Sequence, residues 1–146
     1  MDVKCMAEVK GVNCRAEAHG DEYVPALDVT LMLMNVPVER ISSLCPDLRT
    51  WAYTGGGMVS VGEVNPLTVG HKLENLRVVL GDVSIAGVDI KKGAKIHLQP
   101  NHLANVEVKV QCQQTGTRAS DILTMLREQV MTTITERQLS VVGMEQ

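Results

Sequence analysis

The segment VEVKVQC, residues 106–112, decides the fold class of this chain. Every second residue from Val106 to Cys112 is apolar, and the residues between them carry charged or amide side chains. A period of two places successive side chains on opposite faces of an extended backbone. The segment is therefore predicted to be a β-strand with one face in the core and the other in solvent.

The same alternation recurs along the chain. It predicts strands near 3–18, 27–34, 76–80, 83–90 and 96–98, and β-branched residues predict a last strand at 130–135. Asn35 and Pro37 suit the start of a short helix that continues to Leu48, and either Thr117 or Ser120 caps a second helix. We expect a mostly β (α+β) fold, an antiparallel β-sandwich or open barrel with one short central helix and one C-terminal helix.

Length and composition indicate one domain, residues 1–146, with an aliphatic core. Hydrophobic residues make up 45% of the chain, which excludes intrinsic disorder, yet there is no Phe. Glycines and a proline predict a flexible connection near 54–70, and the C-terminus is expected to fray near 138–146.

Charge and cysteine usage exclude several classes of protein. A net charge of −3 is far from that of a nonspecific nucleic-acid binder. No apolar stretch approaches a membrane span, and the N-terminal segment lacks the apolar core of a secretory signal, so we expect no membrane association. The four cysteines form no C-x-x-C pair and are expected to be free, mostly buried thiols of a cytosolic protein: Cys5, Cys14, Cys45 and Cys112.

Three ionisable side chains that could act in catalysis or metal binding lie within four residues: His19, Asp21 and Glu22. Nitrogen and oxygen atoms at this spacing would suit a metal ion or an acid–base pair. Gly20-Asp21 is also favourable turn chemistry, and we interpret the cluster as the turn between two strands. His97 and His102 would make half a metal site, but no cysteine or carboxylate lies at a matching spacing, so neither metal nor cofactor is expected.

Lys91, Lys92 and Lys95 form a basic group that is predicted to lie at a hairpin tip. One interpretation is a solubilising turn, and the other is contact with the phosphates of a nucleic acid or nucleotide. Lys109 and Arg77 would extend the group if their strands are neighbours.

Trp51 and Tyr53 are two of the three aromatic residues and stand before a glycine run, Gly55 to Gly57. They are either large core anchors or an exposed contact for a partner. The glycine run lacks the Gly-Lys-Ser/Thr ending of a phosphate loop, and no hydrolase or metalloenzyme motif occurs elsewhere. No catalytic residue is assigned.

Several segments together resemble a known family, in the order HGDEYVPALDVTLMLM, CPDLR, LRVVLGDVSIAGVDIKKGAKIHL, VEVKVQC and MLREQVMTTITE. This order is similar to that of a family of small proteins encoded by tailed phages and prophages, often in early or recombination-gene regions. The resemblance covers most of residues 8–138. It implies a phage protein in the host bacterial cytoplasm and transfers no catalytic residue.

The favoured hypothesis is a noncatalytic phage accessory protein that binds a macromolecular partner, most simply a host or phage protein, or a small signal molecule. Such a protein would counter a host defence or assist recombination. The alternatives are a single-stranded nucleic-acid-binding protein and a virion or assembly component. Self-association fits each of them, because Met32 and Met34 lie on the more polar face of their strand.

Overall fold

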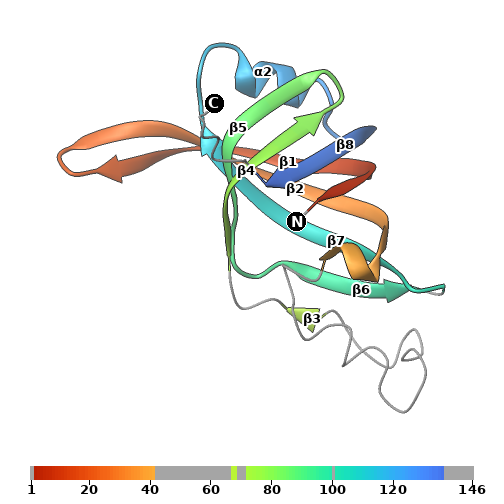
Figure 1. Ribbon diagram of the computed structural model, residues 1–146. Helices are drawn as coiled ribbons and strands as arrows, with labels where there is room; N and C mark the ends of the chain where they lie inside the picture. Colours follow the sequence, from red (N-terminus) through yellow and green to blue (C-terminus); the bar gives the residue numbers. More distant parts are fainter. Residues whose placement is uncertain (1, 42–66, 69–71, 100, 137–146) are drawn as a thin grey trace, which may run out of the picture.

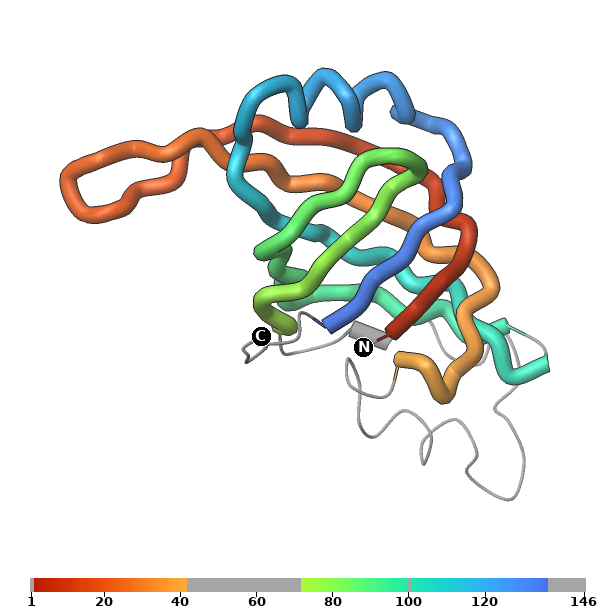
Figure 2. Tube along the Cα trace, turned by 45° about the horizontal axis from the view of Figure 1, so that its top comes forward, coloured from red at the N-terminus to blue at the C-terminus, as the bar shows by residue number. Residues whose placement is uncertain are grey.

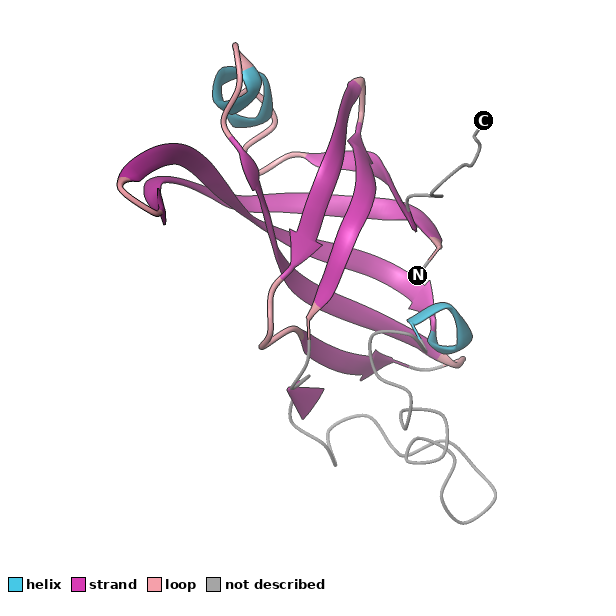
Figure 3. Cartoon of the chain, turned by 60° about the vertical axis from the view of Figure 1, so that its left-hand side comes forward, coloured by secondary structure: helices cyan, strands magenta, loops and turns pink. Residues whose placement is uncertain are grey.

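The computed structural model describes residues 2–41, 67–68, 72–99 and 101–136, and it is mostly β, as predicted (Figure 1). The strands are β1 (Val3–His19), β2 (Glu22–Pro37), β3 (Leu67–Thr68), β4 (Leu73–Leu80), β5 (Val83–Ile90), β6 (Lys95–Gln99), β7 (Leu103–Gln113) and β8 (Gln129–Glu136). The 3-10 helix η1 (Val38–Ile41) and the helix α2 (Arg118–Leu123) lie at opposite ends of the strands (Figure 3).

Six of the strands form a closed antiparallel ring. β2 pairs with β1 along one edge and with β7 along the other. From β1 the pairing passes to β8, β4 and β5, and β5 returns it to β7. Figure 2 shows the strands curving round a common interior. The sequence left a sandwich and an open barrel as alternatives, and the pairings make a barrel that closes.

The two clearest alternating segments lie side by side in the barrel as a pair of antiparallel strands. Leu31 on β2 lies opposite Val108 on β7, and both side chains are buried. The register holds for the neighbouring apolar residues of both strands, so their inner faces meet inside the barrel. Burial of aliphatic side chains is the main favourable term in folding, and it fixes this register because a shift by one residue would turn every side chain outward.

The basic segment from Lys91 to Lys95 is not a hairpin tip, so that prediction is wrong. β5 and β6 both run antiparallel to β7 along the same edge. Ile90 lies opposite Val110, and Lys95 lies opposite Glu107, so the β5–β6 side has two more residues than β7 over this interval. The extra residues form a bulge in one long strand. Gly93, with φ of 93°, supplies the left-handed backbone that the bulge requires.

The two predicted helices differ from expectation within the described residues. Asn35 and Pro37 belong to the end of β2, and η1 contains only four residues, with Val38 and Ile41 buried. Positions 42–48 of that predicted helix lie outside the described residues. In α2, neither candidate caps the helix through its side chain, since Thr117 donates instead to the carboxylate of Asp121 (3.0 Å).

The segment after α2 bonds to β1 instead of continuing the helix. The Arg127 N–H donates to the Val9 carbonyl (2.8 Å), and the Val9 N–H donates to the Glu128 carbonyl (3.2 Å). These two bonds satisfy the N–H and the carbonyl of Val9 on the edge of β1 that also pairs with β8. The chain then continues into β8, the predicted last strand. The predicted connection near 54–70 lies outside the described residues except for β3, and the predicted frayed end near 138–146 lies outside them entirely.

The β1–β2 hairpin extends beyond the barrel, and we call its outer part, residues 16–25, the arm (Figure 1). β2 pairs with β7 only from Ala26 onward, and β1 pairs with β8 only up to Glu8. His19 lies opposite Glu22 across a two-residue turn in which Gly20 has φ of 63°. Gly at the first central position is typical of a type II′ turn. The interpretation of the 19–22 cluster as a turn is confirmed.

The inner face of β2 provides the first prediction. Leu31 is 0% exposed, so Leu31→Ala is expected to lower the free energy of unfolding by about 2–5 kcal/mol, because it removes buried methyl groups and leaves a cavity. Urea denaturation measures the change. The matched control is Lys4→Ala on the exposed face of β1, which should stay within about 0.5 kcal/mol of the wild type. A loss below about 1 kcal/mol for Leu31→Ala would contradict this core.

Candidate functional site

The three predicted lysines gather on the outer face of the barrel together with Lys109. The bulge places Lys91, Lys92 and Lys95 beside β7, and the Lys91 N–H donates to the Lys109 carbonyl (2.9 Å). We call these four residues the lysine face. They border an open hollow of about 420 Å³, whose floor includes Thr30 of β2 and Val108 of β7.

Arg77 does not join the lysine face. It lies on β4 and donates to the hydroxyl of Ser84 (3.0 Å) within the β4–β5 hairpin. Lys109 and Arg77 were expected to extend the basic group if their strands lay beside it. The strand of Lys109 adjoins the bulge, whereas Arg77 lies elsewhere, on β4. Trp51 and Tyr53, the other predicted binding residues, lie outside the described residues.

The positive charge of the lysine face is only partly balanced. Lys91 lies 3.8 Å from the carboxylate of Asp28, and Glu107, at the rim, pairs with Lys10 (3.2 Å). Within the described ranges, Lys92, Lys95 and Lys109 form no ion pair. Three unpaired ammonium groups around one hollow create a local positive potential on a chain whose net charge is negative.

A polar network connects the lysine face to the arm. Asp28 on β2 is only 7% exposed, and its Oδ2 accepts a hydrogen bond from Arg15 Nε (3.0 Å). Arg15 also donates to Glu17 (3.0 Å), which in turn bonds His19 (2.7 Å). Gln111 on β7 donates to the same Glu17 carboxylate. The arm is therefore tied to the barrel by charge-assisted hydrogen bonds, which are stronger than neutral ones.

Asp28 was missed by the sequence reasoning. Its Oδ1 is buried and has no hydrogen-bond partner in the part of the chain that the structure describes. A buried carboxylate is costly unless charged partners compensate for lost hydration, and Arg15 and Lys91 supply this compensation from two sides. The available signal was an acidic residue within an apolar strand, where aspartate is disfavoured.

The network shifts the ionisation of its members. The hydrogen bond from His19, followed by that from Arg15, lowers the pKa of Glu17 below its ordinary value. The hydrogen bond to Asp28 is the main reason that the pKa of Arg15 is raised. Both shifts favour the charged forms, which stabilises the Arg15–Glu17 ion pair at the base of the arm.

The cysteines within the described residues are free, as predicted, but not all of them are buried. Cys5 and Cys112 point into the barrel, and burial raises the pKa of both thiols. A thiol held in its neutral form is a poor nucleophile, so these two residues act as packing groups. Cys14 is exposed on β1. Cys45 lies outside the described residues.

The half metal site considered for His97 and His102 has no third ligand among the described residues. His97 lies on β6 and His102 in the turn before β7. Residues 2–41, 67–68, 72–99 and 101–136 contain no group of three or more His, Cys, Asp or Glu side chains that could hold a metal ion.

No helix in the described part of the chain is long and apolar enough to cross a membrane. Comparisons with family models, curated proteins and solved structures give no match. Function must therefore be argued from the lysine face, the network and the arm.

The shifted carboxylate gives a second prediction. Glu17 is expected to titrate below the ordinary value of 4.5, and His19→Ala should raise its pKa because the first cause of the shift is removed. Carboxyl carbon chemical shifts measured by NMR between acid and neutral pH report this titration. Since the pKa is lowered on folding, the stability that Glu17 contributes is present above its unfolded pKa and is lost as the pH falls through the folded pKa.

The control variant is Glu22→Gln, at the tip of the same hairpin, which removes a carboxylate that bonds neither His19 nor Arg15. It should leave the lowered pKa of Glu17 unchanged, because the bonds from His19 and Arg15 remain. If Glu17 titrates at its ordinary value in the wild type, the hydrogen-bonded network does not form in solution.

Proposed function

We propose that this chain is a noncatalytic phage accessory protein of the host bacterial cytoplasm, which binds an acidic surface of a partner protein through the lysine face. The observation that carries the proposal is the group of three lysines that form no ion pair with any described residue, Lys92, Lys95 and Lys109. Complementary charge speeds encounter with an acidic partner and selects against basic ones.

The rigidity of the surface supports a binding role. Lys109 is on a strand that pairs along both edges, and the bulge is held to that strand by a backbone hydrogen bond. Binding groups on strands keep their positions more accurately than groups on loops. The backbone that carries the lysines is thus preorganised, so a partner need not order it on binding. Counter-defence and recombination roles both fit a protein that acts by occupying a partner's surface.

Single-stranded nucleic acid is the second candidate, because the same lysines suit phosphate groups. Proteins that bind single strands without sequence preference also stack bases on aromatic side chains. The aromatic residue in the described ranges, Tyr23, lies at the end of the arm and not beside the lysines. The lysine face alone favours a protein surface over an extended single strand.

A binding measurement with two probes tests the proposal. At low ionic strength, the protein is expected to bind a fluorescein-labelled Glu-rich peptide, measured by fluorescence anisotropy. Lys92→Glu/Lys95→Glu should weaken this binding by about tenfold or more, since roughly 1.4 kcal/mol of attraction is lost. Salt should weaken it further, because exposed charges are screened.

The matched control, Lys4→Glu/Arg77→Glu, changes the net charge by the same amount away from the lysine face. It should retain the peptide affinity. Equal losses in both variants would show that only net charge matters and would overturn the proposed surface. Preference for a labelled oligothymidylate over the peptide would favour the nucleic-acid candidate instead.

A further inference from the structure

We infer that an acidic surface which fits the lysine face is the arm tip of a second copy of the chain, in a two-fold dimer with the two arms antiparallel. This inference rests on the proposed function, because it uses the same lysine face, and it names the partner. It is carried by the charge, the exposure and the length of the arm.

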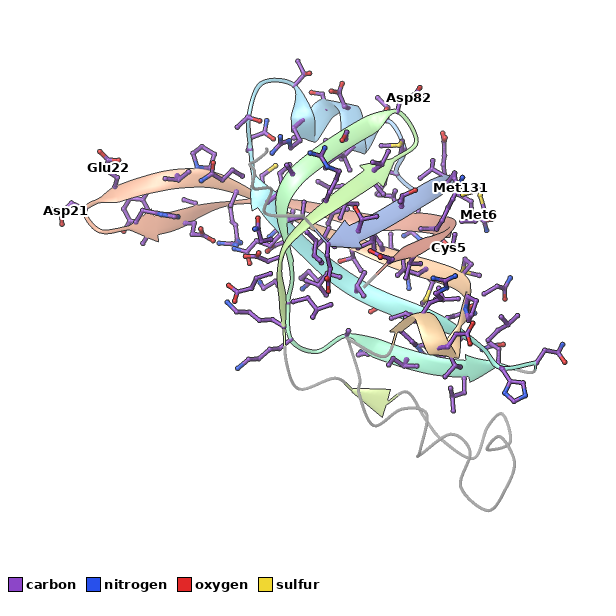
Figure 4. The ribbon with its side chains drawn as sticks, in the orientation of Figure 1. Cys5, Met6, Asp21, Glu22, Asp82 and Met131 are labelled. Atoms are coloured by element: carbon purple, nitrogen blue, oxygen red, sulfur yellow. The ribbon has the colours of Figure 1, made fainter. Side chains whose placement is uncertain are left out.

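The arm tip has the complementary charge and a large side chain. Asp21 and Glu22 are exposed, and neither forms an ion pair with any described residue. The other acidic group of the arm, Glu17, is already paired with Arg15 and His19. Two uncompensated carboxylates at the tip thus match the unpaired lysines of the face (Figure 4).

Tyr23 follows the acidic pair and is 76% exposed, the highest value among the exposed large hydrophobic residues that the structure describes. An exposed tyrosine is a typical anchor of a protein interface, because it buries a large area at a low cost in side-chain entropy. The hollow at the lysine face is bordered by Thr30, Gly93, Glu107 and the lysine side chains. The methylene groups of the lysines and the hydroxyl of Thr30 can contact such an anchor.

The arm of one copy cannot reach its own lysine face. The tip lies about 15 Å beyond the last β2–β7 pair, at about 3.3 Å per residue, and the face lies in the opposite direction along β2, beside Thr30. From Ala26 to Thr30 the distance is about 13 Å by the same measure. A two-fold axis midway between tip and face brings each tip to the other copy's face, and because the two lengths are similar this axis passes near Ala26.

The arm also lacks the neighbours that stabilise a sheet. Next to the barrel, the Pro25 carbonyl accepts a hydrogen bond from the Gln114 N–H (3.0 Å). Further out, the arm is a two-stranded ribbon with which no other described strand pairs. Isolated two-stranded hairpins are marginally stable in water, and open edges are sites for association with other chains. A two-fold arrangement repeats the tip–face contact twice and closes, so no further copies are added.

Charge reversal tests the dimer, with light scattering after size-exclusion chromatography at about 100 µM protein as the measurement. The wild type is expected to be a dimer that dissociates at high salt. Asp21→Lys/Glu22→Lys and Lys92→Glu/Lys95→Glu should each be monomeric, because tip and face then carry like charges. An equimolar mixture of the two variants should restore the dimer, since both of its tip–face contacts are again between opposite charges.

The β4–β5 hairpin supplies the control. Its turn, Gly81-Asp82, has the same residue types as Gly20-Asp21, and Gly81 has φ of 57°. Unlike the arm, this hairpin consists of two strands of the barrel, and Asp82 lies at its turn (Figure 4). Asp82→Lys/Glu74→Lys changes the net charge as much as the arm variant does, and it should remain dimeric. Tyr23→Ala should weaken dimerisation by about tenfold or more.

The outcomes separate this inference from the proposed function. A monomeric wild type would overturn the inferred dimer. A dimer that survives both charge reversals would show that its contacts are not those between the arm tip and the lysine face. If the peptide still binds the lysine face in that case, the proposed function stands alone. If the face binds no acidic peptide and the chain is monomeric, both fail. Restoration of the dimer by mixing excludes misfolding as the reason for either variant's loss.

Discussion

The pairing of β2 with β7 is the constraint on which the rest of the structure depends. It joins the two most regular alternating segments of the chain along ten residue pairs, from Ala26 opposite Gln113 to Pro37 opposite Leu103. The same pairing closes the ring, so the strands of the barrel leave few open edges. It also brings the inner aliphatic residues of both strands into contact, which is the source of most of the stabilisation.

The features that we connect with function arise where strands are longer than the barrel needs. β1 and β2 run on past the last pair with β7, and the surplus becomes the arm. The β5–β6 side carries two residues more than β7 between Ile90 and Lys95, and the surplus becomes the bulge that presents the lysines. Asp28 lies between these two features and bonds Arg15 on the arm side and Lys91 on the bulge side. Binding groups are thereby placed outside a core that is largely aliphatic.

Much of the fold could be predicted from the sequence, because the apolar rhythm is strong where strands are half-buried. The strands around 27–33 and 106–112, the last strand and the 19–22 turn follow from it. The bulge could not be predicted, since Lys-Lys-Gly-Ala-Lys suits a reversal as well as a bulge, and only the distant strand β7 distinguishes the two. Three of the lysines were identified, whereas Asp28 was not, because its burial depends on Arg15 and Lys91 from other strands. The second helix ends earlier than the apolar spacing of its residues suggests, because backbone bonds between Val9 and residues 127–128 override that spacing.

Residue-resolved NMR of the backbone tests the closed barrel most directly. We expect cross-strand contacts that place Val29 opposite Val110 and Leu31 opposite Val108, with slow amide hydrogen exchange along both edges of β7. An edge strand exchanges rapidly along its open side. Absence of those contacts, together with rapid exchange along the edge of β7 that faces β2, would show an open sheet and would contradict the account.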